Sequence, residues 1–129
     1  MDRLSLALET ARRALSTLEE LAGNGAPTPV ERDAAIQRFE YTFEATWKLL
    51  ALCLRDREGV VAASPKSAFR AAMRAGLLTE EDARLALEMA DDRNLTVHTY
   101  IEALAARIYA RLPAYAALFR RLMETAGAP

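Results

Sequence analysis

The chain has 129 residues, a length that suits one domain over residues 1–129 with a real hydrophobic core. Hydrophobic residues make up 52% and charged residues 27%, which excludes a disordered tail protein. Lys and Arg number 17 against 18 Asp and Glu, so the formal charge of -1 excludes a global positive field, and any RNA contact has to be local.

Two long helices are predicted in the first half of the chain. The first ends at Gly23-Asn24-Gly25. Its apolar face is formed by Leu4, Leu8, Ala11, Leu15, Leu18 and Ala22. For the second, Thr28 is the expected N-cap, Pro29 the first helical residue and Glu31 the closing residue of a capping box, and the helix should run to about Arg57. Its core stripe comprises Ile36, Phe39, Phe43, Trp47, Leu50 and Leu54.

Three further helical regions follow. Ser64-Pro65 begins a shorter helix that Gly76 closes, and Thr79 begins a fourth that runs toward Arg93. Low helix propensity predicts a break at residues 94–97, and the last helical region has Pro113 inside it, which predicts a kink or a restart. No segment shows sustained period-two alternation. We therefore expect an all-α, up-and-down antiparallel bundle of about five helices.

The chain carries a single cysteine, Cys53, which lies between leucines and is expected to pack in the core. It cannot form an internal disulfide, which suits a reducing compartment. The N-terminal sequence alternates charges with leucines, unlike a signal peptide, and no stretch approaches the roughly 20 apolar residues of a membrane span. We expect a soluble, cytoplasmic protein.

The stretch DRNLTVHTY at residues 92–100 holds the only histidine. On an unbroken helix Arg93 and His98 would lie roughly 140° apart, but a break between them allows both to point into one cleft. Histidine can exchange a proton near neutral pH, and arginine can hold a phosphate, so the pair suits phosphodiester cleavage in which the RNA 2'-OH attacks. Asn94 could orient the arginine or the phosphate, and Tyr100 could stack on a base or donate a hydrogen bond.

Structural roles compete with this interpretation. A histidine at a helix junction commonly caps a carbonyl or packs in the core, and Asp92 beside Arg93 could form only a surface ion pair. Two further groups have structural alternatives. A basic group that could contact RNA or an acidic partner could equally be a solvated face, and an aromatic group that could stack on bases more simply belongs to the core, except for Tyr41. The basic group is Lys66, Arg70 and Arg74; the aromatic group is Phe39, Tyr41, Phe43 and Trp47.

Several common sites are not encoded. One His and one Cys do not supply the usual ligands of a zinc site, and the chain lacks the GxxxxGK(S/T), GxGxxG and GxSxG motifs. We expect no metal and no cofactor.

Several motifs together resemble the nucleotidyltransferase substrate-binding protein family of the HEPN superfamily, the HepT-like partners of minimal nucleotidyltransferases. They are RFEYTFE at residues 38–44 with Trp47-Lys48, Ser64-Pro65-Lys66, Ala75-Gly76-Leu77, and Asp92-Arg93-Asn94 with His98-Thr99-Tyr100. The chain departs from the expected pattern where Ile101 separates Tyr100 from Glu102. This puts a role for the carboxylate in doubt and leaves the Arg-x4-His-x-Tyr motif intact.

The resemblance implies a five-helix bundle that forms a homodimer, with the two Arg-x4-His motifs facing one cleft. It also implies a metal-independent ribonuclease toxin in which His98 is the general acid or base, Arg93 stabilises the transition state and Asn94 assists. A minimal nucleotidyltransferase would act as antitoxin and add adenylyl groups to Tyr100. Two alternatives stay open: a non-catalytic subunit that presents a nucleotide or substrate to its partner, or a segment that merely builds the dimer interface.

Overall fold

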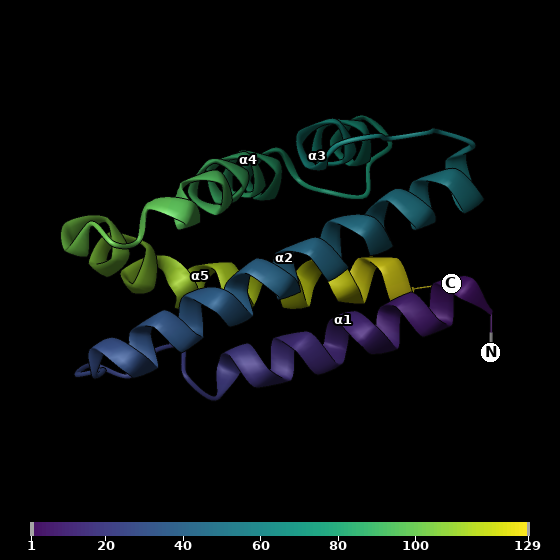
Figure 1. Cartoon of the computed structure of the whole chain (residues 1–129). Coiled ribbons are helices and arrows are strands. Elements are labelled where there is room, and N and C mark those ends of the chain that lie inside the picture. The colour runs from purple at the N-terminus through teal and green to yellow at the C-terminus, as the bar shows by residue number, and fades with distance from the viewer. Residues whose placement is uncertain (1, 129) are drawn as a thin grey trace.

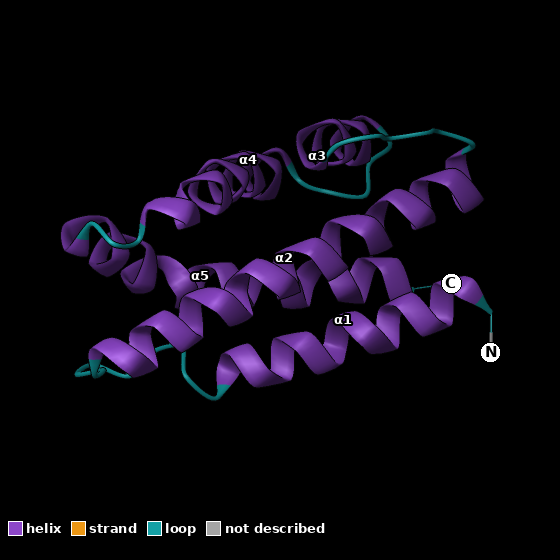
Figure 2. Ribbon diagram, viewed as in Figure 1, coloured by secondary structure: helices purple, strands orange, loops and turns teal. Residues whose placement is uncertain are grey.

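The computed structural model describes residues 2–128, and within them the chain forms five α-helices and one short 3-10 turn, with no strand (Figures 1 and 2). The helices are α1 (Arg3–Glu19), α2 (Pro29–Glu58), α3 (Pro65–Arg74), α4 (Glu80–Leu95) and α5 (Glu102–Gly127), and the turn η1 (Thr96–His98) follows α4. The predicted all-α bundle of about five helices is confirmed.

Capping residues explain where the helices begin and end. Thr28 accepts a hydrogen bond from the Glu31 backbone N–H, and the Glu31 side chain accepts one from the Thr28 N–H, which is the predicted capping box. At the other end of α2, Gly59 adopts φ +65°, a left-handed conformation that glycine accepts without a steric penalty. The first helix is shorter than its apolar face suggested, because it ends at Glu19 and a turn continues to Gly23.

The long helices α1, α2 and α5 pack lengthwise against one another and contain most of the core (Figure 1). α1 and α2 form an antiparallel hairpin. α3 and α4 then carry the chain back across the bundle, so that α5 begins near the start of α2 and lies along it. This path places the α4–α5 junction beside the first turns of α2.

An aromatic cluster lies at the centre of the core. The Phe39 ring centroid lies 5.5 Å from Tyr115, 6.0 Å from Phe119 and 6.3 Å from Phe43. Phe43 makes an edge contact with Phe69 of α3 at 6.0 Å. Such clusters combine large apolar burial with favourable ring geometry. Phe39 and Phe43 are core residues as predicted.

Other core predictions have mixed outcomes. Cys53 is fully buried, and burial raises the pKa of its thiol, as expected for a packing residue. Trp47 is only partly buried at the edge of the core. The chain does not restart at Pro113, because α5 continues through it. Between residues 2 and 128 no helix combines the length and the apolar character that crossing a bilayer requires.

Candidate functional site at the α4–α5 junction

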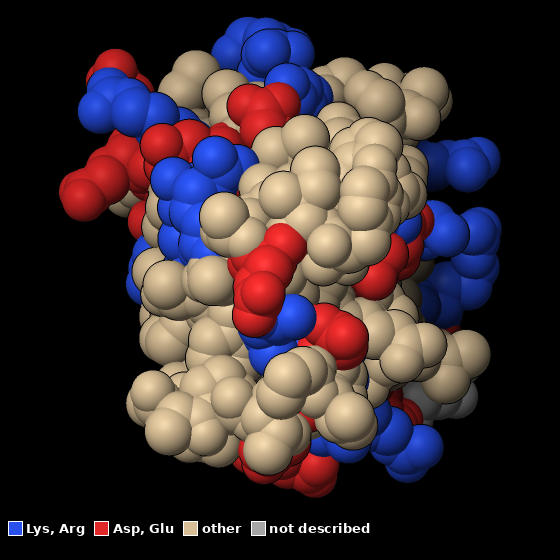
Figure 3. All heavy atoms as spheres, turned by 60° about the vertical axis from the view of Figure 1, so that its left-hand side comes forward, with Lys and Arg blue, Asp and Glu red and all other residues tan. Residues whose placement is uncertain are grey.

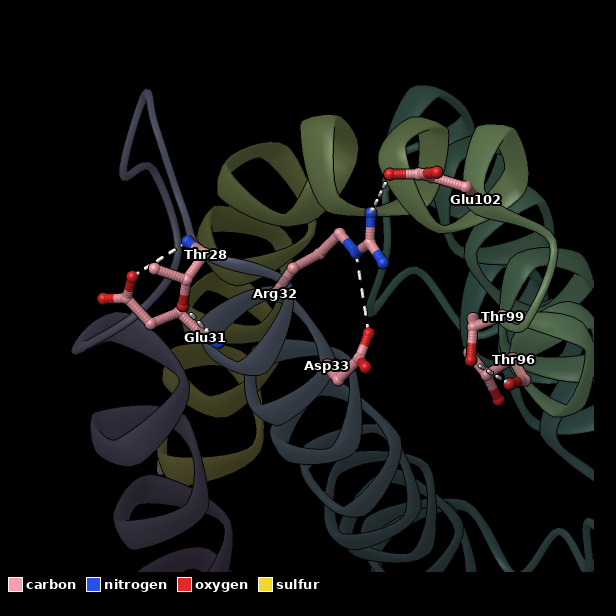
Figure 4. A network of polar contacts seen from close by, with 7 residues as sticks. All are labelled: Thr28, Glu31, Arg32, Asp33, Thr96, Thr99 and Glu102. Carbon is pink, nitrogen blue, oxygen red and sulfur yellow. Dashed lines mark hydrogen bonds and ion pairs between the residues drawn. The ribbon is translucent and has the colours of Figure 1, made fainter.

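Threonine side chains end α4 where the sequence predicted a break. Thr96 donates its hydroxyl to the Arg93 carbonyl at 2.7 Å, and Thr99 donates to the Thr96 carbonyl at 3.0 Å (Figure 4). These hydroxyls add hydrogen bonds to carbonyls at the end of α4, where the chain turns through η1 before α5 starts. The break predicted at residues 94–97 is confirmed.

His98 and Tyr100 form an exposed pair on this junction. His98 Nδ1 lies 3.1 Å from the Tyr100 hydroxyl, and the two rings meet edge to face at 5.7 Å. The Tyr100 residue is 79% exposed, and His98 is also exposed. Since Tyr100 occupies Nδ1, Nε2 is the ring nitrogen left to face a ligand. The histidine is therefore neither a core residue nor the cap of a carbonyl.

Arg93 lies in the last turn of α4 and points toward α2. Its Nη1 is 3.8 Å from Glu40 Oε2, and its Nη2 is 3.8 Å from Glu44 Oε1. The arginine side chain is only 26% exposed, and its Nε is buried without a hydrogen-bond partner in the described part of the chain. No hydrogen bond joins Arg93 to His98 in the described residues, 2–128. A single chain therefore leaves the two motif residues apart.

Asp92 does not form the surface ion pair that the sequence suggested. The residue is 2% exposed, and its carboxylate accepts hydrogen bonds from the Tyr115 hydroxyl at 2.5 Å and from Arg111 at 2.9 Å, with Arg107 3.7 Å away. All three partners belong to α5. Burial and the neighbouring carboxylate raise the pKa of Tyr115. Asp92, the residue before Arg93, thus links α4 to α5.

Two of the candidate polar residues, from separate helices, meet at one cavity. Lys66 of α3 and Asn94 of α4 both line a hollow of about 240 Å³ together with Phe43, Ser64, Pro65 and Ala90. Lys66 also forms an ion pair with Asp91 at 2.6 Å. Arg70 and Arg74 are exposed on α3 and do not line this hollow. Of the three basic residues, only Lys66 lines this hollow.

Charges of both signs are interspersed on the face shown in Figure 3, together with wide uncharged areas.

Arg32 of α2 reaches across to Glu102, the first residue of α5, with Nη1 3.8 Å from the carboxylate (Figure 4). Glu102 lies in the first turn of α5, where its acidic side chain also complements the helix dipole. Tyr41, which the sequence left open, hydrogen-bonds to Thr17 and is only partly exposed.

Sequence reasoning missed the roles of Glu40, Glu44 and Asp92. The signal that could have found them was their spacing from buried residues on the same helix. Glu40 and Glu44 lie one turn apart and directly follow the core residues Phe39 and Phe43, while Asp92 lies three residues after the buried Met89. Among residues 2–128, no group of three or more His, Cys, Asp or Glu side chains is arranged to hold a metal ion.

The fold and the junction define a small all-α domain with an exposed histidine–tyrosine pair where two helices meet and an arginine in the last turn of the first of them. The chain belongs to the family described as nucleotidyltransferase substrate binding protein like, whose family model matches residues 6–127. This confirms the family resemblance seen in the sequence. No curated protein matches the chain.

Solved structures share the fold. A crystal structure of a Thermus thermophilus protein is 58% identical, with a TM-score of 0.90, and the match covers 92% of this chain and 99% of that one. A tri-AMPylated HEPN toxin of Shewanella oneidensis, in complex with an MNT antitoxin, is 18% identical with a TM-score of 0.79 over 97% of each chain. A Haemophilus influenzae protein, described as having the fold of a substrate binding domain of a nucleotidyltransferase, is 23% identical with a TM-score of 0.68 over 97% of each chain.

Proposed function

We propose that the chain is a cytoplasmic HEPN-type ribonuclease subunit that needs no metal ion and is controlled by a minimal nucleotidyltransferase. One observation carries the proposal: His98 and Tyr100 lie exposed at a helix junction, and Arg93 lies one turn before it. The Shewanella protein with this fold is described as a HEPN toxin bound to an MNT antitoxin, which supports the same role and partner here.

The reaction uses the RNA itself as nucleophile. His98 Nε2 takes the proton of a 2'-OH, the 2' oxygen attacks the adjacent phosphorus, and the bond from phosphorus to the 5' oxygen breaks. The leaving 5' oxygen receives a proton, so the products are a 2',3'-cyclic phosphate and a 5'-OH. Arg93 stabilises the charge that develops on the phosphate oxygens, and Asn94 assists in holding the phosphate. Lys66 beside Asn94 supports an RNA contact at that hollow.

We further propose a homodimer in which two junctions face one another. Arg93 and His98 make no hydrogen bond to each other within the described part of one chain, so a second copy would bring the arginine of one protomer toward the histidine of the other. The junction exposes three large apolar side chains, Val97 at 65%, Tyr100 at 79% and Ile101 at 48%. Exposed apolar groups gathered in this way favour burial against another protein surface.

Regulation by the partner would act on Tyr100. Transfer of a nucleotidyl group to its hydroxyl would place a negative phosphate beside His98, because the two groups are 3.1 Å apart. The added nucleotide would also occupy the position where RNA has to lie. The Shewanella toxin with this fold is tri-AMPylated, which supports nucleotidyl transfer as the form of control.

A second function has its own supporting observation. The two carboxylates beside Arg93 neutralise part of its positive charge, which weakens its attraction for RNA phosphate. A non-catalytic subunit that binds a nucleotide or substrate for its nucleotidyltransferase does not need Arg93 to stabilise a transition state, so this arrangement is compatible with it. The family description and that of the Haemophilus protein support this alternative.

Cleavage of end-labelled RNA in EDTA by the purified chain decides between the two functions. Wild type should produce 2',3'-cyclic phosphate ends, His98→Ala should produce none, and Tyr100→Phe should still cleave because it keeps the ring and the histidine. If a folded wild-type protein cleaves none of several RNAs, the binding subunit is the correct function.

A further inference from the structure

Two carboxylates of α2 lie beside the guanidinium of Arg93. Glu40 and Glu44 are one helical turn apart, and each lies 3.8 Å from a different terminal nitrogen of the arginine. The side chains are 33% and 39% exposed, against 26% for Arg93. Partial burial reduces screening by salt, so the two ion pairs act more strongly here than on an open surface.

Glu44 is itself fixed by its neighbours. The indole Nε1–H of Trp47 donates to Glu44 Oε2 at 3.2 Å, and Lys48 Nζ lies 3.7 Å from the same oxygen. The other oxygen, Oε1, faces Arg93. Because Trp47 packs against the edge of the core, its hydrogen bond restricts the position of the Glu44 carboxylate. A chain of contacts therefore runs from Trp47 through Glu44 to Arg93.

These contacts orient Arg93 without using its hydrogen bonds. A separation of 3.8 Å attracts the opposite charges but exceeds the usual length of a hydrogen bond, which is at most about 3.2 Å for N–H to O. The terminal nitrogens of the guanidinium can therefore still donate to a phosphate. The two carboxylates also oppose phosphate binding in the ground state, because they neutralise the positive charges of Arg93 and Lys48.

We propose that Glu40 and Glu44 are positioning residues for Arg93 and that Trp47 sets the orientation of Glu44. This inference rests on the proposed ribonuclease function, in which Arg93 is the group that touches the phosphate. Positioning of the guanidinium favours the transition state, while the negative charge of the pair weakens ground-state binding of RNA. The two effects predict a distinct kinetic signature for variants.

Kinetics on a cleavable RNA give the first test. The double variant Glu40→Gln with Glu44→Gln should lower kcat by roughly tenfold to a hundredfold, as expected for a misplaced catalytic group, and should also lower KM. Glu9→Gln is a matched control, because Glu9 is also 39% exposed and pairs with Arg13 within α1. A purely structural role would lower kcat only in proportion to the folded fraction, measured by circular dichroism, and would leave KM unchanged. That result, or wild-type constants in the double variant, would overturn the inference.

Fluorescence gives a second test that does not need cleavage. Trp47 is the only tryptophan of the chain, so its emission reports directly on the Glu44 contact. Glu44→Gln and Arg93→Met should each shift this emission, and Glu9→Gln should not. If wild type cleaves no RNA, the proposed function fails, and the emission alone judges the inference: a shift in both variants supports it, and unchanged emission in Arg93→Met refutes it.

Discussion

The three-helix bundle of α1, α2 and α5 differs sharply from the junction between α4 and α5. In the bundle most of the large side chains are buried, and Phe39 and Phe119 are 0% exposed. In the junction Val97, Tyr100 and Ile101 are largely exposed, and His98 is exposed beside them. The folding free energy is therefore concentrated in the bundle, while the groups capable of chemistry lie where few stabilising contacts depend on them. Substitutions should affect stability in the first region and activity in the second.

The largest loss of stability should follow removal of the central aromatic ring. Phe39→Ala deletes contacts with three other rings and leaves a cavity that the surrounding helices cannot fill, so unfolding should become easier by about 3–5 kcal/mol. Urea unfolding followed by circular dichroism measures this value. Phe39→Leu should cost clearly less. A loss below about 1 kcal/mol for the alanine variant would contradict the central place of Phe39 in the core.

Asp92 should give the next largest effect because it links the junction to the bundle. Asp92→Asn keeps the size of the side chain but removes the charge that Arg111, Arg107 and Tyr115 bind, which should cost about 1.5–3 kcal/mol in urea unfolding. The neighbouring Asp91→Asn is the matched control, since Asp91 is exposed and its ion pair with Lys66 should contribute less than about 1 kcal/mol. Equal losses in the two variants would show that burial of Asp92 adds nothing to the free energy of unfolding.

Tyr115 predicts how stability depends on alkaline pH. Burial first, and then Asp92, raise the pKa of its hydroxyl above the ordinary value of 10.0. The folded protein therefore keeps a proton that the unfolded chain loses, so this contribution is fully present below pH 10 and falls as the pH rises above it. By pH 11 the loss should be on the order of 1 kcal/mol. Urea unfolding at pH 9 and 11 should show a smaller loss in Tyr115→Phe, and equal losses in the two proteins would be the contrary result.

The capping box at the start of α2 should contribute less. Thr28→Ala removes the acceptor for the Glu31 backbone N–H and should lower stability by about 1 kcal/mol. Thr28→Ser keeps the hydroxyl and serves as the control. Thermal unfolding of the three proteins compares these values, and an unchanged midpoint for the alanine variant would mean that water replaces the cap without cost.

Local signals in the sequence were sufficient for most of the fold. Thr28, Pro29 and Glu31 marked the start of α2, and the spacing of Phe39 and Phe43 marked its buried face, because capping and helical periodicity act over only a few residues. Pro113 was harder to interpret. Its backbone lacks an N–H, but tertiary packing of α5 along α1 and α2 maintains one continuous helix.

The candidate site could be predicted only in part. The break after Leu95 followed from the low helix propensity of Asn94, Thr96 and Val97. The partners of Arg93 could not be predicted in the same way, because Glu40 and Glu44 are distant in the sequence and meet it only through the crossing of α2 and α4. The sequence suggested an exposed Asp92 paired with its neighbour Arg93. Its partners in the structure lie instead on α5, which is distant in the sequence.

The smallest effect on stability is expected at the histidine. His98 hydrogen-bonds only to the exposed Tyr100 within the described residues, so His98→Ala should change the free energy of unfolding by less than about 0.5 kcal/mol. If the junction merely builds a dimer interface, the same change should weaken the dimer, and size-exclusion chromatography over a range of concentrations would show this. An unchanged dimer that no longer cleaves RNA would separate chemistry from assembly. A weakened dimer would instead mean that the exposed junction contributes to stability once a second copy covers it.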